Sequence, residues 1–181
     1  TANFRSLKDG LVAYYPFNGN ANDESGNGNH GEVSGAALAE DRFGVADSSY
    51  ELVADDVITV SNPFDGMQSF TKSLWFRVDN IGDHWGLLHS SACEIKLFQN
   101  SFAIYFNEAR TNSSHSRKHR YYADVKQDQL KTWNQLIVSA KNDNEFSIYL
   151  NGYELKVGSK NTSPPEGWGN DPLIIGYKRS G

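Results

Sequence analysis

The chain has 181 residues, of which 38% are hydrophobic and 22% charged, a globular rather than a disordered composition. The net charge of −5 gives no reason to expect a nucleic-acid partner. No apolar run reaches the roughly 18 residues of a spanning helix, so we expect no membrane insertion. The single cysteine excludes an internal disulfide. The chain begins at Thr1 without a leader, from which we expect a piece of a longer or processed polypeptide.

Three strands are predicted in the first half of the chain. Residues 11–17 (LVAYYPF) form a short apolar and aromatic run. Residues 57–60 (VITV) are β-branched, which favours a strand. Residues 70–78 (FTKSLWFRV) alternate with a period of two, which is typical of a strand with one buried face. The alternation places Trp75 on the face opposite Phe76.

The second half predicts a series of further strands. Asn151 and Gly152 separate two of them, and Asn-Gly between alternating runs is a strong hairpin signal because both residues tolerate positive φ. Helical periodicity is confined to residues 124–131, and residues 109–119 predict a long, polar and basic loop. The expected strands are residues 95–98, 102–106, 134–140, 145–150, 153–157 and 173–177. The pattern predicts an all-β sandwich or jelly roll.

Residues 10–31 read GLVAYYPFNGNANDESGNGNHG and resemble the opening of bacterial laminin G-like domains, which belong to the concanavalin A-like lectin/glucanase jelly rolls. The resemblance implies one laminin G-like domain over residues 1–181, a two-sheet antiparallel jelly-roll sandwich. The chain stops at Gly181, so the family's final strand is expected to be missing or supplied from elsewhere. Further agreeing blocks are residues 41–44 (DRFG) with Ser49 and Tyr50, residues 70–75, Trp133, residues 146–152 and residues 174–176.

A calcium site is expected in the first loop. Residues 18–29 are rich in side-chain oxygens, and glycines there let the backbone turn sharply. Because related folds often hold a structural calcium in this region, the resemblance implies Ca²⁺ here too. The expected ligands are Asp23, with weaker contributions near Ser25, Asn27 and Asn29. The alternative is that Asn and Gly simply build tight turns.

Catalysis is not expected. The pair of carboxylates at even spacing that glycosidases of this fold carry on one strand is missing, and Asp55 and Asp56 are adjacent. The histidines are in no HExxH or Cys/His arrangement, and His115 and His119, although four residues apart, lie in an expected loop rather than on a helix. Cys93 has no evident histidine partner. The sequence therefore predicts a protein that is not an enzyme.

The candidate ligand-binding residues are aromatic or cationic. Sugars pack on aromatic faces, with a few polar groups that bond their hydroxyls. Side chains on the non-core parity of their strands are predicted to line an exposed concave sheet, and loop residues are a second candidate. Packing under loops is the alternative for each aromatic. The predicted residues are Trp75, Arg77, Tyr105 and Tyr149 on strands, and Trp85, Arg110 and Trp168 in loops.

The sequence thus predicts a non-catalytic, lectin-like carbohydrate-binding module, stabilised by calcium. Its expected setting is an exported or cell-surface multidomain protein such as an adhesin, with a glycan or polysaccharide as the partner. Laminin G-like domains also bind proteins, so a protein-recognition or structural spacer module is the first alternative. A polysaccharide hydrolase or lyase is the second.

Overall fold

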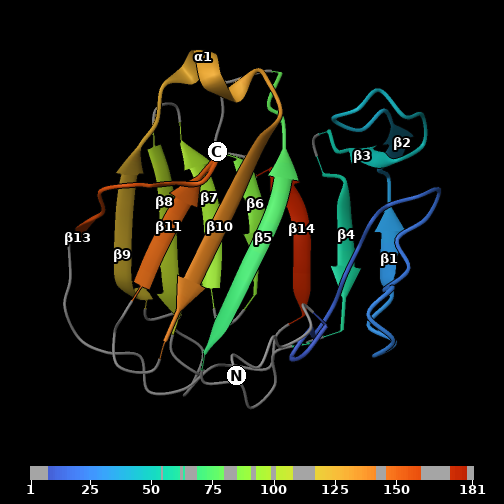
Figure 1. The fold of residues 1–181 in the computed structure, drawn as a ribbon, viewed down its shortest axis with the longest axis horizontal. Helices are drawn as coiled ribbons and strands as arrows, with labels where there is room; N and C mark the ends of the chain where they lie inside the picture. The colour runs from blue at the N-terminus through green and yellow to red at the C-terminus, as the bar shows by residue number, and fades with distance from the viewer. Residues whose placement is uncertain are drawn as a thin grey trace, which may run out of the picture.

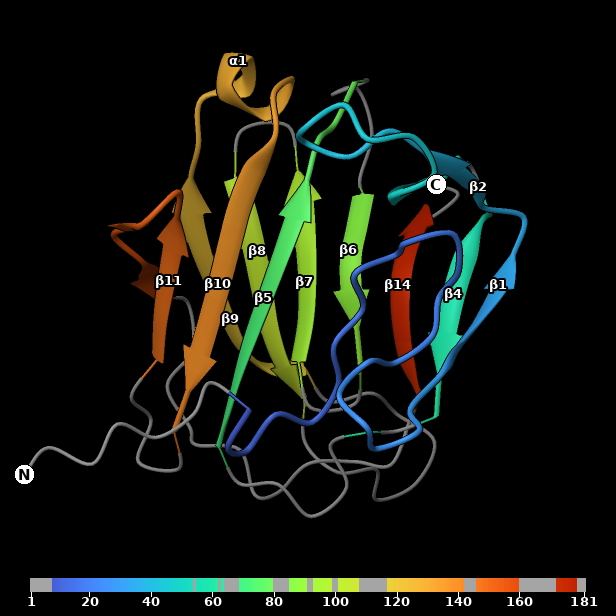
Figure 2. The same cartoon turned by 45° about the vertical axis from the view of Figure 1, so that its right-hand side comes forward.

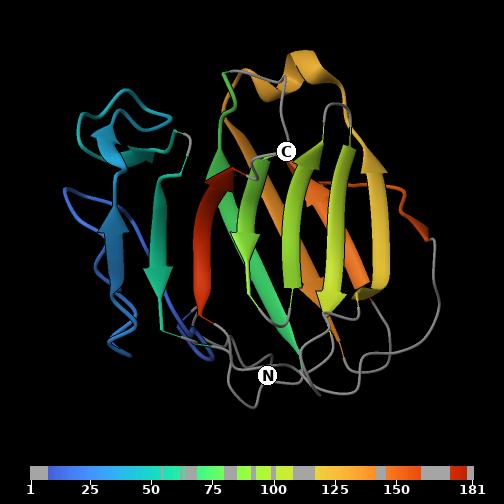
Figure 3. The ribbon, with the colours of Figure 1, turned by 180° about the vertical axis from the view of Figure 1, so that it is seen from behind.

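The protein is an antiparallel β-sandwich. The computed structural model describes residues 8–53, 55–61, 63, 69–79, 85–90, 93–98, 101–107, 117–141, 146–159 and 172–178. The larger sheet runs in the order β1-β4-β14-β6-β7-β8-β9-β13, and the smaller in the order β12-β11-β10-β5. Figure 1 shows the smaller sheet in front of the larger one, and Figure 3 shows the larger sheet from behind. A two-stranded ribbon, β2 with β3, lies beside them.

The strand bounds follow the alternating sequence runs. In the larger sheet they are β1 (Gly31–Ser34), β4 (Val57–Val60), β14 (Leu173–Lys178), β6 (Trp85–His89), β7 (Cys93–Phe98), β8 (Ser101–Asn107), β9 (Arg117–Asp124) and β13 (Gly158–Ser159). In the smaller sheet they are β12 (Tyr153–Glu154), β11 (Phe146–Leu150), β10 (Asn134–Ala140) and β5 (Phe70–Phe76). The ribbon contains β2 (Ala37–Ala39) and β3 (Ser49–Glu51), and the single described helix is α1 (Gln127–Leu130). Nothing in the described residues forms a helix with the length and apolarity needed to cross a membrane.

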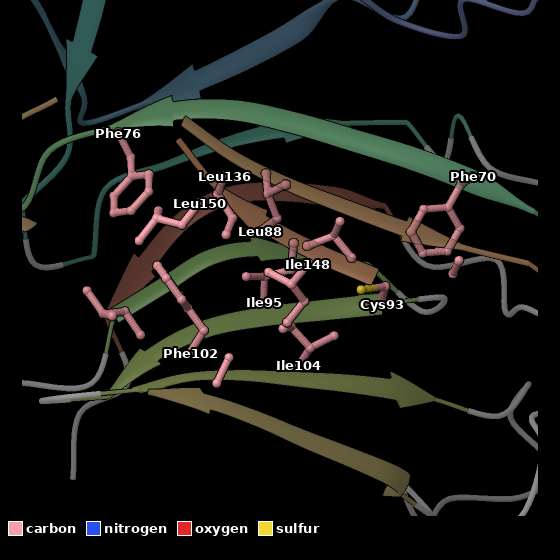
Figure 4. Packing of buried hydrophobic residues seen from close by; sticks show 14 of the residues in the cluster. Phe70, Phe76, Leu88, Cys93, Ile95, Phe102, Ile104, Leu136, Ile148 and Leu150 are labelled. Carbon is pink, nitrogen blue, oxygen red and sulfur yellow. The ribbon is translucent and has the colours of Figure 1, made fainter. Parts of the chain in front are cut away.

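The core fills the space between the two sheets. On β5 and β10, buried side chains alternate with side chains on the outer face, as period-two strands require. Phe76 of β5 meets Phe102 of β8 edge to face, with 5.9 Å between ring centroids. Ile95, Ile104 and Leu136 are fully buried, and Figure 4 shows side chains from both sheets pointing toward one another. Each such burial stabilises the fold by about 1.5–3 kcal/mol.

Most of the predicted strands are confirmed, but the run at residues 153–157 forms a strand only over its first two residues, in β12. The expected hairpin across residues 99–101 pairs β7 with β8 over Cys93↔Phe106 to Phe98↔Ser101. The expected Asn-Gly turn is present, with φ of 51° at Asn151 and 82° at Gly152. The expected helical turn is α1.

The predicted strand at residues 11–17 is wrong. This segment has no strand partner, because side chains and backbone groups of the neighbouring loop, rather than a strand, bond its backbone. Asp23 accepts the backbone N–H of Tyr14, and Asn29 donates to the carbonyl of Val12. Phe17 ends the segment with a positive φ of 58°. Figure 2 shows this coil in front of β14 and β4, where it continues the layer of the smaller sheet.

The predicted loop at residues 109–119 is partly wrong. Its last three residues begin β9, which pairs with β8. Residues 108–116 lie outside the described residues. The basic composition of residues 117–119 favoured a loop, but it does not prevent strand pairing, and β9 lies between β8 and β13 in the sheet.

Candidate ligand-binding surface

Trp75 lies on the outer face of the smaller sheet. Its neighbour Phe76 turns into the core and is 7% exposed, whereas Trp75 is 43% exposed. The prediction from the period-two pattern is therefore confirmed for these two residues. β5 is the edge strand of its sheet, so Trp75 has one strand neighbour, Gln135 of β10. A large apolar ring is thus presented to solvent at a sheet edge.

Polar groups surround the indole on this face. Gln135 donates its side-chain amide to Ser73 Oγ at 3.3 Å. The backbone N–H of Gln135 donates to Asn151 Oδ1 at 2.8 Å, which holds β10 against the Asn-Gly turn. Tyr149 of β11 is half-buried and pairs with Ile137, so it shares this outer face, two strands away from Trp75. Two aromatics and several hydroxyl and amide groups therefore occupy one sheet face.

Arg42 reaches Trp75 from the turn between β2 and β3. Its guanidinium carbon lies 4.6 Å from the centroid of the Trp75 ring and 4.3 Å from that of Phe43. Figure 2 shows this turn extending toward the end of β5. Arg42 is exposed, and Phe43 is 73% exposed. A cation thus rests against two aromatic rings at the solvent boundary, a contact worth about 0.5–1 kcal/mol at such sites.

The turn that carries Arg42 is fixed by Asp41. Asp41 Oδ1 accepts the backbone N–H groups of Phe43 at 2.8 Å and Val45 at 2.9 Å. Backbone bonds close the same turn, from Gly44 N to the Asp41 carbonyl and from Asp41 N to the Val45 carbonyl. Gly44 has φ of 78°, a value that favours glycine. The guanidinium is therefore presented from a backbone with its geometry already set.

Arg77 continues the same cluster but is charge-neutralised. Its Nε lies 3.0 Å from Asp79 Oδ1, and its Nη2 donates to Asp79 Oδ2 at 3.1 Å. Its guanidinium carbon lies 5.7 Å from the centroid of the Trp133 ring. The two arginines thus differ. Arg77 forms an ion pair with Asp79, whereas the contacts of the Arg42 guanidinium among the described residues are with aromatic rings.

The predicted ligand residues do not share one sheet. Trp75, Arg77 and Tyr149 belong to the smaller sheet or its end, whereas Tyr105 belongs to β8 of the larger sheet, where it pairs with Glu94. The expectation of one concave sheet lined by all the strand residues is therefore corrected. Parity assigns a side chain to a face, but it does not reveal which strands share a sheet. Trp85 begins β6, also in the larger sheet, and Arg110 and Trp168 lie outside the described residues.

The four predicted calcium ligands meet in the first loop. Asp23 is 5% exposed, and its Oδ1 accepts the backbone N–H groups of Tyr14 and Ser25, both at 2.9 Å. Its Oδ2 accepts the Ser25 hydroxyl at 2.8 Å and the backbone N–H of Asn29 at 3.0 Å. Burial by itself raises the pKa of the Asp23 carboxyl. The hydrogen bonds together outweigh this effect and lower the pKa from 3.8 to about 2. Asn27 donates to the carbonyls of residues 11 and 12.

This arrangement does not fit a calcium ion at Asp23. A carboxylate has about four lone-pair sites, and all four are taken by N–H and O–H donors. The side-chain amide nitrogens of Asn27 and Asn29 both donate to the Val12 carbonyl, so this oxygen is also engaged. The described residues contain no group of three or more His, Cys, Asp or Glu side chains placed to hold a metal. Calcium binding stays a prediction that these hydrogen bonds do not favour.

Several functional groups were missed by sequence reasoning. Arg42 and Gln135 join Trp75 only through the fold, although Arg42 belongs to the DRFG block that resembles the family. On the outer face of the larger sheet, Lys96 Nζ lies 2.8 Å from Glu94 Oε1, and both side chains are almost fully buried. His89 Nδ1 lies 3.3 Å from the same oxygen. The alternation of β7 assigns these charges to the outer face, but nothing in the pattern reveals their burial.

A charged side chain also enters the core. Lys72 has the parity of Phe70 and Phe76 and is 6% exposed, and its Nζ donates to Ser90 Oγ at 3.0 Å. Burial lowers the pKa of this lysine. The sequence offers only its parity as a signal, because a lysine in an alternating strand is usually assigned to the surface.

Solved structures with the same fold come from clostridial toxins. The binding domain of Paraclostridial Mosquitocidal Protein 1 has a TM-score of 0.68 and 17% identity, covering 97% of this chain and 46% of that one. The botulinum neurotoxin serotype C1 binding domain has a TM-score of 0.70 and 15% identity, covering 97% of this chain and 45% of that one. The botulinum neurotoxin DC binding domain in complex with SialylT has a TM-score of 0.68 and 14% identity, covering 96% of this chain and 45% of that one. The chain spans less than half of these solved chains, and identities this low show the fold alone.

The sequence comparisons give the family. No match is found among curated proteins. The family model described as the concanavalin A-like lectin/glucanases superfamily, of the laminin G type, matches residues 52–181. This match covers more than half of the chain, and the two antiparallel sheets agree with it. The chain therefore belongs to the laminin G-like family of the concanavalin A-like lectin/glucanases superfamily.

Proposed function

We propose that this domain is a non-catalytic, lectin-like module that binds carbohydrate on the outer face of its smaller sheet. We call the cluster of Trp75, Arg42, Phe43, Arg77 and Gln135 the Trp75 surface. The proposed setting is an exported or cell-surface multidomain protein such as an adhesin. Calcium is not part of the proposed binding mechanism, since the Asp23 oxygens are already hydrogen-bonded.

The observation that carries the proposal is the exposure of Trp75 beside groups that can bond hydroxyls. An indole packs on the C–H face of a sugar ring, and neighbouring amide and hydroxyl groups fix its orientation. Gln135 and Ser73 supply such groups on the adjoining positions of the sheet. Tyr149 lies further along the same face, where a second sugar unit of an oligosaccharide would extend.

The comparisons support a binding role. The solved structures of this fold include a toxin binding domain in complex with SialylT, and one of botulinum neurotoxin type C, whose cell entry is described as dependent on interaction with two ganglioside molecules. These descriptions belong to those proteins. They support the proposal that the Trp75 surface binds carbohydrate.

The chemistry of the surface also favours binding over catalysis. Glycosidases flank the scissile bond with two carboxylates. The described groups against Trp75 are a guanidinium, an amide and aromatic rings, and the carboxylate of Asp79 is held by Arg77. This set orients a ligand without supplying an acid and a nucleophile.

A protein ligand is the second candidate. Phe43 is 73% exposed and Val45 53% exposed in the same turn, which gives the surface an apolar rim. Aromatic and arginine side chains are common anchors in protein interfaces. A related binding domain has been solved in complex with rat synaptotagmin II.

A glycan-array screen, run in calcium and repeated in EDTA, tests the proposal. We expect hits in both buffers that are lost in Trp75→Ala and kept in Tyr153→Ala. Tyr153 is the matched control because it is 79% exposed and lies on β12, at the opposite edge of the same sheet. Loss of the hits in EDTA alone would assign binding to calcium, and an empty array would favour the protein ligand.

A further inference from the structure

We propose that the ligand of the Trp75 surface carries a carboxylate, as in a uronic or sialic acid, and that Arg42 binds it. This inference rests on the proposed function and specifies its ligand class. The observation behind it is the position of the Arg42 guanidinium. A hydrogen-bonded turn holds it against the exposed rings of Phe43 and Trp75.

The donors of Arg42 are available to a ligand. Guanidinium has five N–H donors in a planar fork that matches a carboxylate with two parallel bonds. Rings attract its charge but offer no oxygen acceptor. Within the described part of the chain, the contacts of the Arg42 side chain are with the rings of Phe43 and Trp75, and no carboxylate lies within ion-pair distance.

The nearest acid in the sequence is engaged elsewhere. Asp41 Oδ1 accepts two backbone N–H groups inside the turn, so this carboxylate holds the loop rather than neutralising Arg42. Arg77, in contrast, has its own carboxylate in Asp79 at 3.0 Å. An incoming carboxylate therefore meets one arginine paired with Asp79 and one, Arg42, that has no ion-pair partner among the residues that the structure describes.

Preorganisation makes this position suited to binding. The two rings limit the freedom of the Arg42 side chain, so less entropy is lost when the ligand binds. The indole would contact the sugar ring while the fork holds its carboxylate. Lysine would keep the charge in this position but lose the paired geometry.

Isothermal titration calorimetry with acids and their methyl esters tests the inference. The probes are trigalacturonate and sialyllactose, each compared with its methyl ester, in which a neutral ester replaces every carboxylate. For at least one pair we expect the acid to bind about tenfold more tightly than the ester. Arg42→Gln should remove this difference and Arg42→Lys should restore part of it. Lys156→Gln, an exposed charge after β12, is the control and should keep the full difference.

The outcomes separate the two proposals. Equal binding of acid and ester through Trp75 would overturn the carboxylate inference and leave carbohydrate binding intact. Preference for the acid that persists in Arg42→Gln would overturn the role of Arg42. Failure of both acids to bind, with neutral array hits that depend on Trp75, would overturn the inference alone. An array without hits would overturn both.

Discussion

Two polar segments of this domain use their side chains in opposite ways. The first loop, residues 18–31, is rich in Asn, Asp and Gly, and its polar groups bond one another and residues 11–14. The turn between β2 and β3 is shorter and closes on one oxygen of Asp41, and the exposed Arg42 lies against the rings of Phe43 and Trp75. The abundance of polar residues therefore does not identify a binding site. A better indicator is a polar side chain that the fold holds in place while its hydrogen-bonding groups remain without partners among the described residues.

Removal of the Asp23 carboxylate is the strongest way to break this comparison. Asp23→Asn replaces one accepting oxygen by an N–H₂ group that faces donors, so at least one buried N–H loses its partner. We expect a loss of about 3 kcal/mol in the free energy of unfolding, measured by urea denaturation. Asp55→Asn, at an exposed position, is the control and should change stability little. Equal stability of the two variants would mean that Asp23 does not organise the loop.

Acid titration probes the same loop without relying on a substitution alone. The pKa of Asp23 is about 2 in the folded protein against 3.8 for an ordinary aspartate, so the unfolded chain binds more protons between these values. Stability from this group is present above about pH 5 and is lost as the pH falls toward 2. We expect this loss to be about 1–2 kcal/mol after allowance for solvent screening, and to be absent from Asp23→Asn. If the free energy of unfolding fell with pH in the same way in the wild type and in Asp23→Asn, this role of Asp23 would be contradicted.

Asp79→Asn sharpens the comparison between the two arginines, with the smallest effect. The Arg77–Asp79 pair is exposed, so its loss should change stability by less than about 1 kcal/mol. Arg77 would then have free donors, as Arg42 has, and we expect about a twofold gain in affinity for the acidic probe by titration calorimetry. Affinity for the methyl ester is the internal control and should not change. A weaker affinity for the acid would show that Asp79 itself contacts the ligand.

The sequence predicted the fold well where a local pattern sufficed. Alternation gave the strands and the faces of Trp75 and Phe76, and the Asn-Gly turn followed from the φ values that these residues tolerate. It failed at residues 11–17, because an apolar run does not show that Asp23 and Asn29 will satisfy its backbone from a distance. Local periodicity contains no information on such non-local bonds.

The candidate site was predicted only in part. Trp75 and Arg77 follow from strand parity, but Arg42 reaches the indole only because the turn between β2 and β3 extends toward the end of β5. Tyr105 was grouped with Trp75 by parity, although its strand belongs to the other sheet. Assembly of a site from separate strands requires the sheet order, which a single sequence does not supply.

The most direct test of the account is an NMR titration of ¹⁵N-labelled protein with trigalacturonate and, in parallel, with its methyl ester. We expect the indole N–H signal of Trp75 and the side-chain Nε–H signal of Arg42 to shift together on addition of the acid. The ester should shift them less at equal concentration. Shifts confined to signals of the larger sheet, or equal shifts with acid and ester, would contradict a carboxylate site built by Arg42 and Trp75.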